Sequence, residues 1–285
     1  MKNSIQNIGW LLRRTHNTKL ISKFYENVIQ APIIRTHDEN LIHWCGGTTV
    51  LGFNKVSNQN NLIEDNGNFI TTYKVRTISK IKELSKTRDP QLTHKKINGI
   101  TLFKDPENIT FGLKEVSEKE PDYFDNDWIH IKKRQDQNLT NNFVLSNNFL
   151  GISSFIIKSK NWKKNAEFYK EYLQLNTIFQ DDKRIELALD SRTLLIFMLS
   201  KINNINYDSR LHVRQSFVFR ALNAKIVADD LQTQGYKLIE KPHITGDHAG
   251  EIYYFKDISG QVFGIQTRKN SHRIEDIAAN KLIKK

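Results

Sequence analysis

The chain has a single cysteine and no long apolar run. One cysteine, Cys45, excludes an internal disulfide and is typical of a protein from a reducing compartment. No stretch approaches the roughly 20 apolar residues that a membrane-spanning helix needs. The first residues also lack the apolar region of a signal peptide. These absences predict a cytoplasmic protein without a membrane partner.

Common signatures of catalysis are missing as well. The sequence contains no glycine-rich phosphate-binding loop, no recognisable serine nucleophile turn and no zinc-ribbon cysteine spacing. Cys45 has no histidine and acid arranged around it as in a thiol enzyme, so we interpret it as a small buried residue. The sequence therefore assigns no catalytic residue.

Basic residues outnumber acidic residues in the chain. Lysine and arginine total 43 against 31 aspartates and glutamates, which gives a formal net charge of +12. Such a balance can indicate nucleic-acid binding. The basic residues are spread along the chain, however, and the densest cluster is only Lys132–Arg134. We therefore do not expect a nucleic-acid partner, and the charge favours an anionic small molecule instead.

What the chain does contain is an internal repeat. The stretches 100–113 (ITLFKDPENITFGL) and 252–265 (IYYFKDISGQVFGI) are identical at six of fourteen positions. A Phe-Tyr pair also recurs, at Phe24-Tyr25 and Phe168-Tyr169. Both pairs of copies are separated by about half the chain, which indicates a duplication.

The hydrophobic pattern divides each half into two modules of a strand, a capped helix and three further strands. The predicted first strands are 8–15, 69–75, 150–158 and 216–221, and the predicted capping residues are Asn17, Thr77, Asn161 and Asn223. We predict an α+β fold of four βαβββ modules, paired into two tandem half-barrel domains. The predicted boundaries are a first domain over 1–115, a connector over 116–148, a second domain over 149–268 and a basic tail over 269–285.

These features resemble the vicinal oxygen chelate superfamily, which includes glyoxalases, extradiol dioxygenases and bleomycin-resistance proteins. The matching motifs are the Phe-Tyr pair of each half and the Phe-x-Asp-x-x-[Asn/Gly] hairpin that closes each half, and the resemblance covers about 8–115 and 150–268. It implies that each pair of modules forms a half-open barrel with a ligand on its concave face. In many members that face also binds a divalent metal through histidine and glutamate.

The resemblance locates eight metal-ligand positions, counted from the capping residues and the hairpin aspartates. In this chain they are occupied by Trp10, Gly52, Ile70, Gly112, Ser154, Ile196, Ser216 and Gly264. None is a histidine, cysteine or carboxylate, the side chains that bind such metals in proteins. We therefore expect no metal cofactor and a face that binds a small organic molecule.

Side chains on the same faces are the candidate ligand contacts. They are Trp10, Arg14, His43, Ser154, Lys158, Ser216 and Arg220. Trp10 offers a flat apolar platform or simply fills the barrel, and Arg14, further along the same face, can pair with an anionic group. The serines, Lys158 and Arg220 suit a polar or acidic ligand, although such residues on strands are often just solvated. His43 is either a general base or ligand contact facing the cavity, or a surface or satisfied strand histidine, which is the interpretation we prefer.

Two alternatives stay open at this stage. The segment 242–248 holds His243, Asp247 and His248, and with Glu251 it could provide displaced ligands for a metal-dependent lyase, isomerase or extradiol dioxygenase. A polar loop between strands is the interpretation we prefer for it. The other alternative is an interaction module that uses the basic surface. Pairing of two chains into a homodimer also stays open.

Overall fold

The computed structural model describes residues 5–37, 40–45, 49–56, 62–63, 67–86, 95–116, 148–189, 193–201, 207, 209–244 and 251–267. None of the helices in these ranges is long and apolar enough to cross a membrane. The interior of the predicted connector over 116–148 and the predicted basic tail over 269–285 lie outside the described residues.

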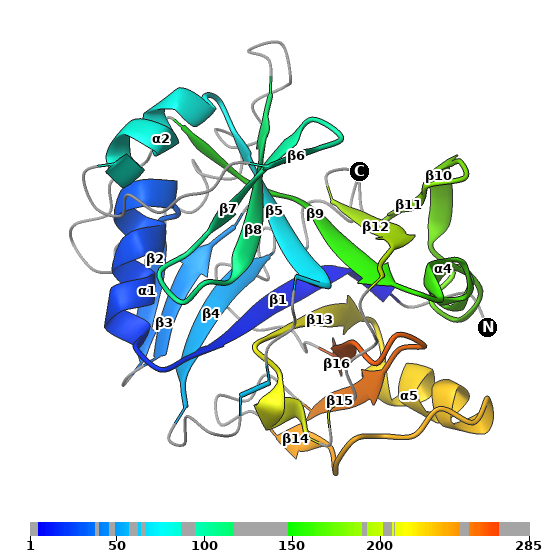
Figure 1. Ribbon diagram of the computed structural model, residues 1–285. Coiled ribbons are helices and arrows are strands. Elements are labelled where there is room, and N and C mark those ends of the chain that lie inside the picture. The colour runs from blue at the N-terminus through cyan, green and yellow to red at the C-terminus, as the bar shows by residue number, and fades with distance from the viewer. Residues whose placement is uncertain are drawn as a thin grey trace. The chain divides into compact units, whose positions relative to one another are not determined.

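The first two modules follow the predicted order of strand, helix and three strands (Figure 1). The first comprises β1 (Ile5–Thr15), α1 (Thr18–Phe24), the π-helical turn η1 (Tyr25–Ile29), β2 (Ile33–His37), β3 (Asn40–Trp44) and β4 (Val50–Lys55). The second comprises β5 (Phe69–Val75), α2 (Ile78–Lys86), β6 (Lys95–Ile97), β7 (Ile100–Lys104) and β8 (Thr110–Glu115).

The last two modules repeat this order. The third comprises β9 (Phe149–Ser159), α4 (Trp162–Tyr172), β10 (Asn176–Gln180), β11 (Arg184–Ala188) and β12 (Leu194–Leu199). A short 3-10 helix, η3 (Arg210–His212), precedes the fourth, which comprises β13 (Gln215–Ala221), α5 (Ala224–Thr233), β14 (His243–Ile244), β15 (Glu251–Lys256) and β16 (Val262–Thr267). The α+β fold class is therefore confirmed.

The predicted capping residues start their helices in different ways. The Asn17 side chain accepts a hydrogen bond from Leu20 N at 3.0 Å, and the Asn223 side chain accepts one from Ile226 N at 3.2 Å. Asn161 also occupies the N-cap position, but its side chain makes no capping bond. Its backbone is outside the extended region that a capping asparagine usually adopts, with ψ at 31°. The predicted side-chain cap is thus wrong for Asn161.

The strands form two eight-stranded sheets. Their orders are β14-β15-β16-β13-β1-β4-β3-β2 and β10-β11-β12-β9-β5-β8-β7-β6. The first sheet thus contains the strands of the first and fourth modules, and the second sheet those of the second and third. This order differs from the pairing of successive modules that the boundaries 1–115 and 149–268 suggest, and those boundaries stay a prediction.

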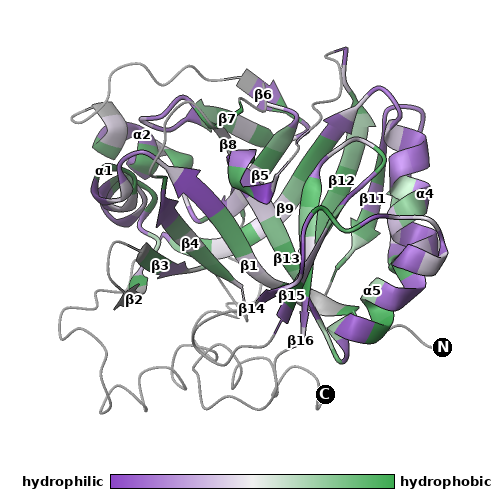
Figure 2. Ribbon diagram, turned by 90° about the horizontal axis from the view of Figure 1, so that it is seen from below, coloured by the Kyte–Doolittle hydropathy of each residue, from purple (hydrophilic) through white to green (hydrophobic). Residues whose placement is uncertain are grey.

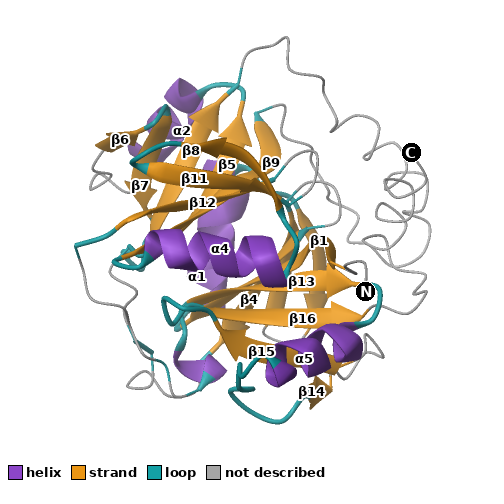
Figure 3. Cartoon of the chain, turned by 90° about the vertical axis from the view of Figure 1, so that its right-hand side faces the viewer, coloured by secondary structure: helices purple, strands orange, loops and turns teal. Residues whose placement is uncertain are grey.

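One compact unit of the chain comprises Met1–Arg14, Asn58–Phe69 and Ser154–His272. In it, α4 lies against β11 and β12, and α5 lies against β15 and β16 (Figure 3). The ring of Tyr169 on α4 packs 5.1 Å from that of Phe197 and 5.8 Å from that of Phe263, measured between centroids. The outer side of α4 is hydrophilic (Figure 2). Aromatic burial between helices and strands therefore forms this core.

The repeated Phe-Lys-Asp turn is held by a buried carboxylate. Asp257 Oδ2 accepts hydrogen bonds from Tyr169 Oη and Asn165 Nδ2, both at 3.0 Å. Asp257 Oδ1 accepts three more, from Ser259 N, Ser259 Oγ and Gln261 N at 2.6–2.9 Å. The tyrosine of the second Phe-Tyr pair thus donates a hydrogen bond to the aspartate of the second hairpin, which gives both of these motif residues a structural role.

The other compact unit comprises Thr15–Ser57, Ile70–Ser153 and Arg273–Lys285. Its core centres on Tyr25, whose ring lies 5.1 Å from that of Phe53 and 5.9 Å from that of Tyr73. The hairpin aspartate of this half, Asp105, accepts hydrogen bonds from Glu107 N at 2.9 Å and Ile109 N at 3.0 Å. The same turn therefore closes both halves of the repeat.

Candidate functional site

Alternation along β13 separates its side chains into two faces. Phe217 and Phe219 point into the core, where their rings contact Tyr169 of α4. Ser216 and Val218 lie on the opposite face, opposite Leu12 and Trp10 of β1. Gly264 of β16 lies between Val218 and Tyr254 of β15. We call this surface the seat face; it consists of Trp10, Leu12, Ser216, Val218, Ile252, Tyr254 and Gly264, and three of the expected metal-ligand positions lie on it.

The seat face is packed with the protein's own apolar side chains. Its buried cluster consists of Tyr207, Val213, Val218, Ile252, Tyr254 and Val262, and the partly buried residues against it are Trp10, Leu12, Ile63 and Ile239. Tyr207, Val213 and Ile63 come from segments outside the regular strands, and Ile63 N donates a hydrogen bond to His212 O at 2.9 Å. These segments therefore cover the face that the resemblance assigns to a metal.

A charged group borders the seat face at Tyr254. We call it the rim cluster; it consists of Arg14, Arg210, Glu240, His243 and Tyr254. Arg210 forms an ion pair with Glu240, and its guanidinium lies 5.2 Å from the centre of the Tyr254 ring. The second arginine, Arg14, donates a hydrogen bond from Nη1 to Val213 O at 3.0 Å. Four separate segments thus bring two cations and one carboxylate together.

Arg14 is a cation held inside the protein. It is 4% exposed, and burial lowers its pKa from 12.5 to about 10. The charge of Arg210 lowers that pKa further, whereas Tyr254 and Glu240 raise it. Arg14 remains protonated at neutral pH, because a pKa of about 10 lies well above 7. The site therefore combines positive charge with low exposure to water, which strengthens its attraction for an anion.

His243 is held in its neutral form. Arg210 Nη2 lies 3.3 Å from His243 Nδ1, and arginine can only donate, so Nδ1 accepts and the proton is on Nε2. Partial burial of the ring lowers the pKa of His243, the charges of Arg210 and Arg14 lower it as well, and Glu240 opposes them. An exposed imidazole that offers an N–H beside two arginines suits an anion better than a metal ion.

Comparisons with known proteins reveal the fold and nothing finer. No protein-family profile matches the chain, and no curated protein matches it. A structure from Bacillus subtilis, provisionally assigned as a dioxygenase, superposes with a TM-score of 0.68 at 14% identity, covering 98% of this chain and 92% of that one. A mutant of glyoxalase I from Zea mays superposes with a TM-score of 0.64 at 13% identity, covering 92% of both chains.

The fold is that of the vicinal oxygen chelate superfamily. Many members of this superfamily hold a divalent metal, so the residues at the expected positions can be tested against one. An ideal Cβ at Gly264 would lie 2.9 Å from Ile252 Cγ2, 3.0 Å from Val218 Cγ2 and 3.1 Å from Tyr254 Cε1. A glutamate side chain has no room there unless these neighbours move.

The other positions fail the same test. At Gly112, a Cβ would lie 2.6 Å from Ile100 Cγ2 and 2.8 Å from Thr72 Cγ2. Trp10 provides no metal donor, and a neutral serine hydroxyl such as that of Ser216 is a poor one. The part of the chain that the structure describes contains no group of three histidine, cysteine or carboxylate side chains close enough to share an ion. The residues present do not fit the metal that the superfamily implies.

Four of the seven predicted contacts lie on two neighbouring strands, although Arg220 pairs with Asn7 and therefore lies at the other end of β1 from Arg14. Trp10 and Arg14 are on β1, and Ser216 and Arg220 are on the neighbouring β13. The Ser216 side chain is fully buried, and its hydroxyl has no hydrogen-bond partner among the described residues. Arg220 is also buried and lies beside Gly9, whose missing Cβ would be 3.2 Å from Arg220 Nε.

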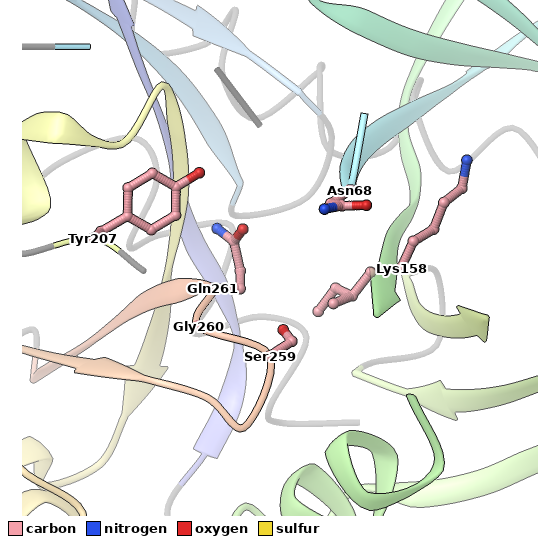
Figure 4. A pocket seen from close by; sticks show the side chains of 7 residues that line it. Asn68, Lys158, Tyr207, Ser259, Gly260 and Gln261 are labelled. Atoms are coloured by element: carbon pink, nitrogen blue, oxygen red, sulfur yellow. The ribbon is translucent and has the colours of Figure 1, made fainter. Parts of the chain in front are cut away.

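Ser154 and Lys158 lie elsewhere, on β9 of the second sheet. Lys158 N donates to Asn68 O at 2.7 Å, and Lys158 lines a small cavity of about 10 Å³. The other lining residues, which come from separate segments (Figure 4), are Asn68, Ile157, Tyr207, Ser259, Gly260 and Gln261. This space accommodates about one water molecule and is too small for an organic ligand.

His43 is buried and satisfied at both ring nitrogens. Nδ1 donates to Ala31 O at 2.7 Å, so Nε2 accepts from Ser22 Oγ at 2.7 Å. Burial lowers its pKa from 6.5 to about 4, against the effect of the Ala31 hydrogen bond. Cys45 is buried too, and burial raises its pKa. These environments favour the interpretation of His43 as a satisfied histidine and of Cys45 as an inert thiol.

Sequence reasoning missed three members of the rim cluster. Arg210 and Glu240 lie outside the repeated motifs, so nothing in the sequence marks them. Tyr254 did carry a signal: the corresponding residue of the first hairpin is Leu102, and only the second copy has a polar hydroxyl there. A difference between two copies of a repeat can thus point to a residue with a role of its own.

Proposed function

We propose that this vicinal oxygen chelate protein binds a small organic anion without a metal, at the rim cluster that borders the packed seat face of β1, β13, β15 and β16. The observation that carries the proposal is the packing at Gly264. Val218, Ile252 and Tyr254 lie so close to this glycine that a metal-binding carboxylate has no room in its place. Trp10, which stays partly exposed, and the rim cluster would contact the ligand.

Charge supports an acidic ligand rather than a neutral one. Two arginines border the seat face, and the nearby carboxylate, Glu240, neutralises one of them. The whole chain carries a net charge of +12, which raises the local concentration of anions. We place the protein in the cytosol, with which its single buried cysteine is compatible. Nothing in the proposal requires a second copy of the chain.

No observation favours the metal-dependent lyase, isomerase or dioxygenase alternative. Its displaced ligands would be His243 and His248, and His248 lies outside the described residues. His243 accepts a hydrogen bond from Arg210, and two arginines beside it repel a divalent cation. We therefore assign no catalytic residue.

Thermal unfolding tests the proposal, because a ligand that binds only the folded state raises Tm. We expect Ni²⁺, Zn²⁺, Mn²⁺ and Fe²⁺ to leave Tm unchanged and a chelator to have no effect. At least one member of a panel of small organic acids should raise it; saturation at a hundredfold excess over Kd stabilises the fold by about 2.7 kcal/mol. A Tm that rises with one of the metals and falls back with chelator would overturn the proposal.

A further inference from the structure

We propose that the ligand is a carboxylate, and that its carboxylate group replaces Glu240 on Arg210. This inference rests on the proposed function and specifies the ligand chemistry. The Glu240 carboxylate would then occupy the ligand position in the empty site. It keeps Arg210 paired until a ligand carboxylate arrives.

Arg210 is oriented independently of Glu240. Its guanidinium lies over the Tyr254 ring at 5.2 Å, and its Nη2 donates to His243 at 3.3 Å. These two contacts keep the planar group in place when its carboxylate partner is exchanged. A positioned guanidinium binds carboxylates well, because its N–H groups match the two oxygens.

Glu240 is the partner that can leave. Its side chain is 29% exposed, against 16% for Arg210. It lies in the segment between α5 and β14, where Ile239 N donates to Tyr254 O at 3.0 Å and Leu238 bridges to Phe255. An ion pair that is partly open to water is only weakly stabilising, so a ligand carboxylate can displace Glu240 at small cost.

The charge balance favours a further anion. Arg14 and Arg210 provide two positive charges, Glu240 provides one negative charge and His243 is neutral, which leaves one positive charge in excess. The excess charge is shielded from water, since Arg14 is 4% exposed. A ligand carboxylate that takes the place of Glu240 keeps Arg210 neutralised, and the excess charge of Arg14 attracts it to the site.

The neighbouring surface indicates the rest of the ligand. The seat face next to the rim cluster is apolar and aromatic, with Trp10 partly exposed and the Tyr254 ring buried. These features suit a monocarboxylate with a flat apolar body.

Benzoate and its neutral analogue benzamide test the inference. Binding of each is measured by calorimetry or NMR titration at millimolar concentration, to the full chain and to Glu240→Gln and Arg210→Gln. We expect Glu240→Gln to bind benzoate about three- to tenfold more tightly, because the competing carboxylate is gone. Arg210→Gln should bind it at least about tenfold more weakly. Benzamide should bind more weakly than benzoate and respond to neither change.

A matched control removes a similar ion pair elsewhere. Arg184 and Glu186 on β11 lie 2.6 Å apart with side chains 24% and 15% exposed, so Glu186→Gln should leave benzoate binding unchanged. The inference would be overturned if benzoate and benzamide bound equally well, or if Glu240→Gln left the affinity for benzoate unchanged. Either result would leave the proposal of metal-free binding intact. Absence of benzoate binding to both the full chain and Glu240→Gln would overturn the inference too. Stabilisation by a metal would instead refute the proposed function.

Discussion

Gly264 and Trp10 occupy two of the positions to which the superfamily resemblance assigns metal ligands, and the sequence alone identifies both residues. What it does not give is how the vacated space is used. Val218, Ile252 and Tyr254 fill it, and those contacts join strands whose neighbours are set by the fold. Side-chain types at a site are therefore predictable from the motif spacing, whereas the packing around them is not.

At the residue scale, His43 makes stability depend on pH. Its pKa in the folded protein is about 4, below the ordinary 6.5, so the unfolded chain takes up the proton first as pH falls. Its contribution is complete above about pH 6.5 and is lost as pH falls towards 4, a change of about 3 kcal/mol. His43→Gln should therefore lose less stability than the unmodified chain between pH 7 and pH 4, as measured by urea unfolding.

Ser22→Ala is the matched control for this experiment. It removes the hydrogen bond to His43 Nε2 but keeps the titrating ring, so its stability should fall with pH as that of the unmodified chain does. If His43→Gln lost as much stability as the unmodified chain between pH 7 and pH 4, the assignment of His43 as buried and neutral would be refuted.

At the scale of elements, the repeated motif predicted the hairpins well because its residues act locally. The turn before β16 forms around Asp257, which accepts bonds from Ser259 and Gln261 two and four residues later. Asn161 shows the limit of such reasoning. It stands at the right position for a cap, yet its backbone conformation keeps its side chain from capping α4.

The Phe-Tyr pair should act through the same turn. Tyr169→Phe keeps the ring in the core but removes the hydroxyl that donates to Asp257 at 3.0 Å. Because the acceptor is a buried carboxylate, we expect a loss of about 1.5–3 kcal/mol in the free energy of unfolding. Tyr253→Phe removes a hydroxyl bonded to Glu251 at a partly buried site and should cost less than about 1 kcal/mol. Equal losses in the two variants would contradict a structural role for the motif.

At the scale of the whole molecule, the duplication predicted four modules but not their order in the sheets. Modules are visible in the sequence because each has its own strand and helix pattern. The adjacency of β1 and β13 depends on contacts between Trp10 and Val218 and between Leu12 and Ser216, which lie about 200 residues apart in the chain. No local pattern records such a pairing.

The central claim is that a vicinal oxygen chelate fold persists here with apolar packing where a metal would be bound. Its most direct test is the metal content of the protein purified without chelator from cells supplied with nickel, zinc, iron and manganese. The account predicts far less than one equivalent of any of these metals per chain. One tightly held equivalent, bound by residues of these strands, would contradict it.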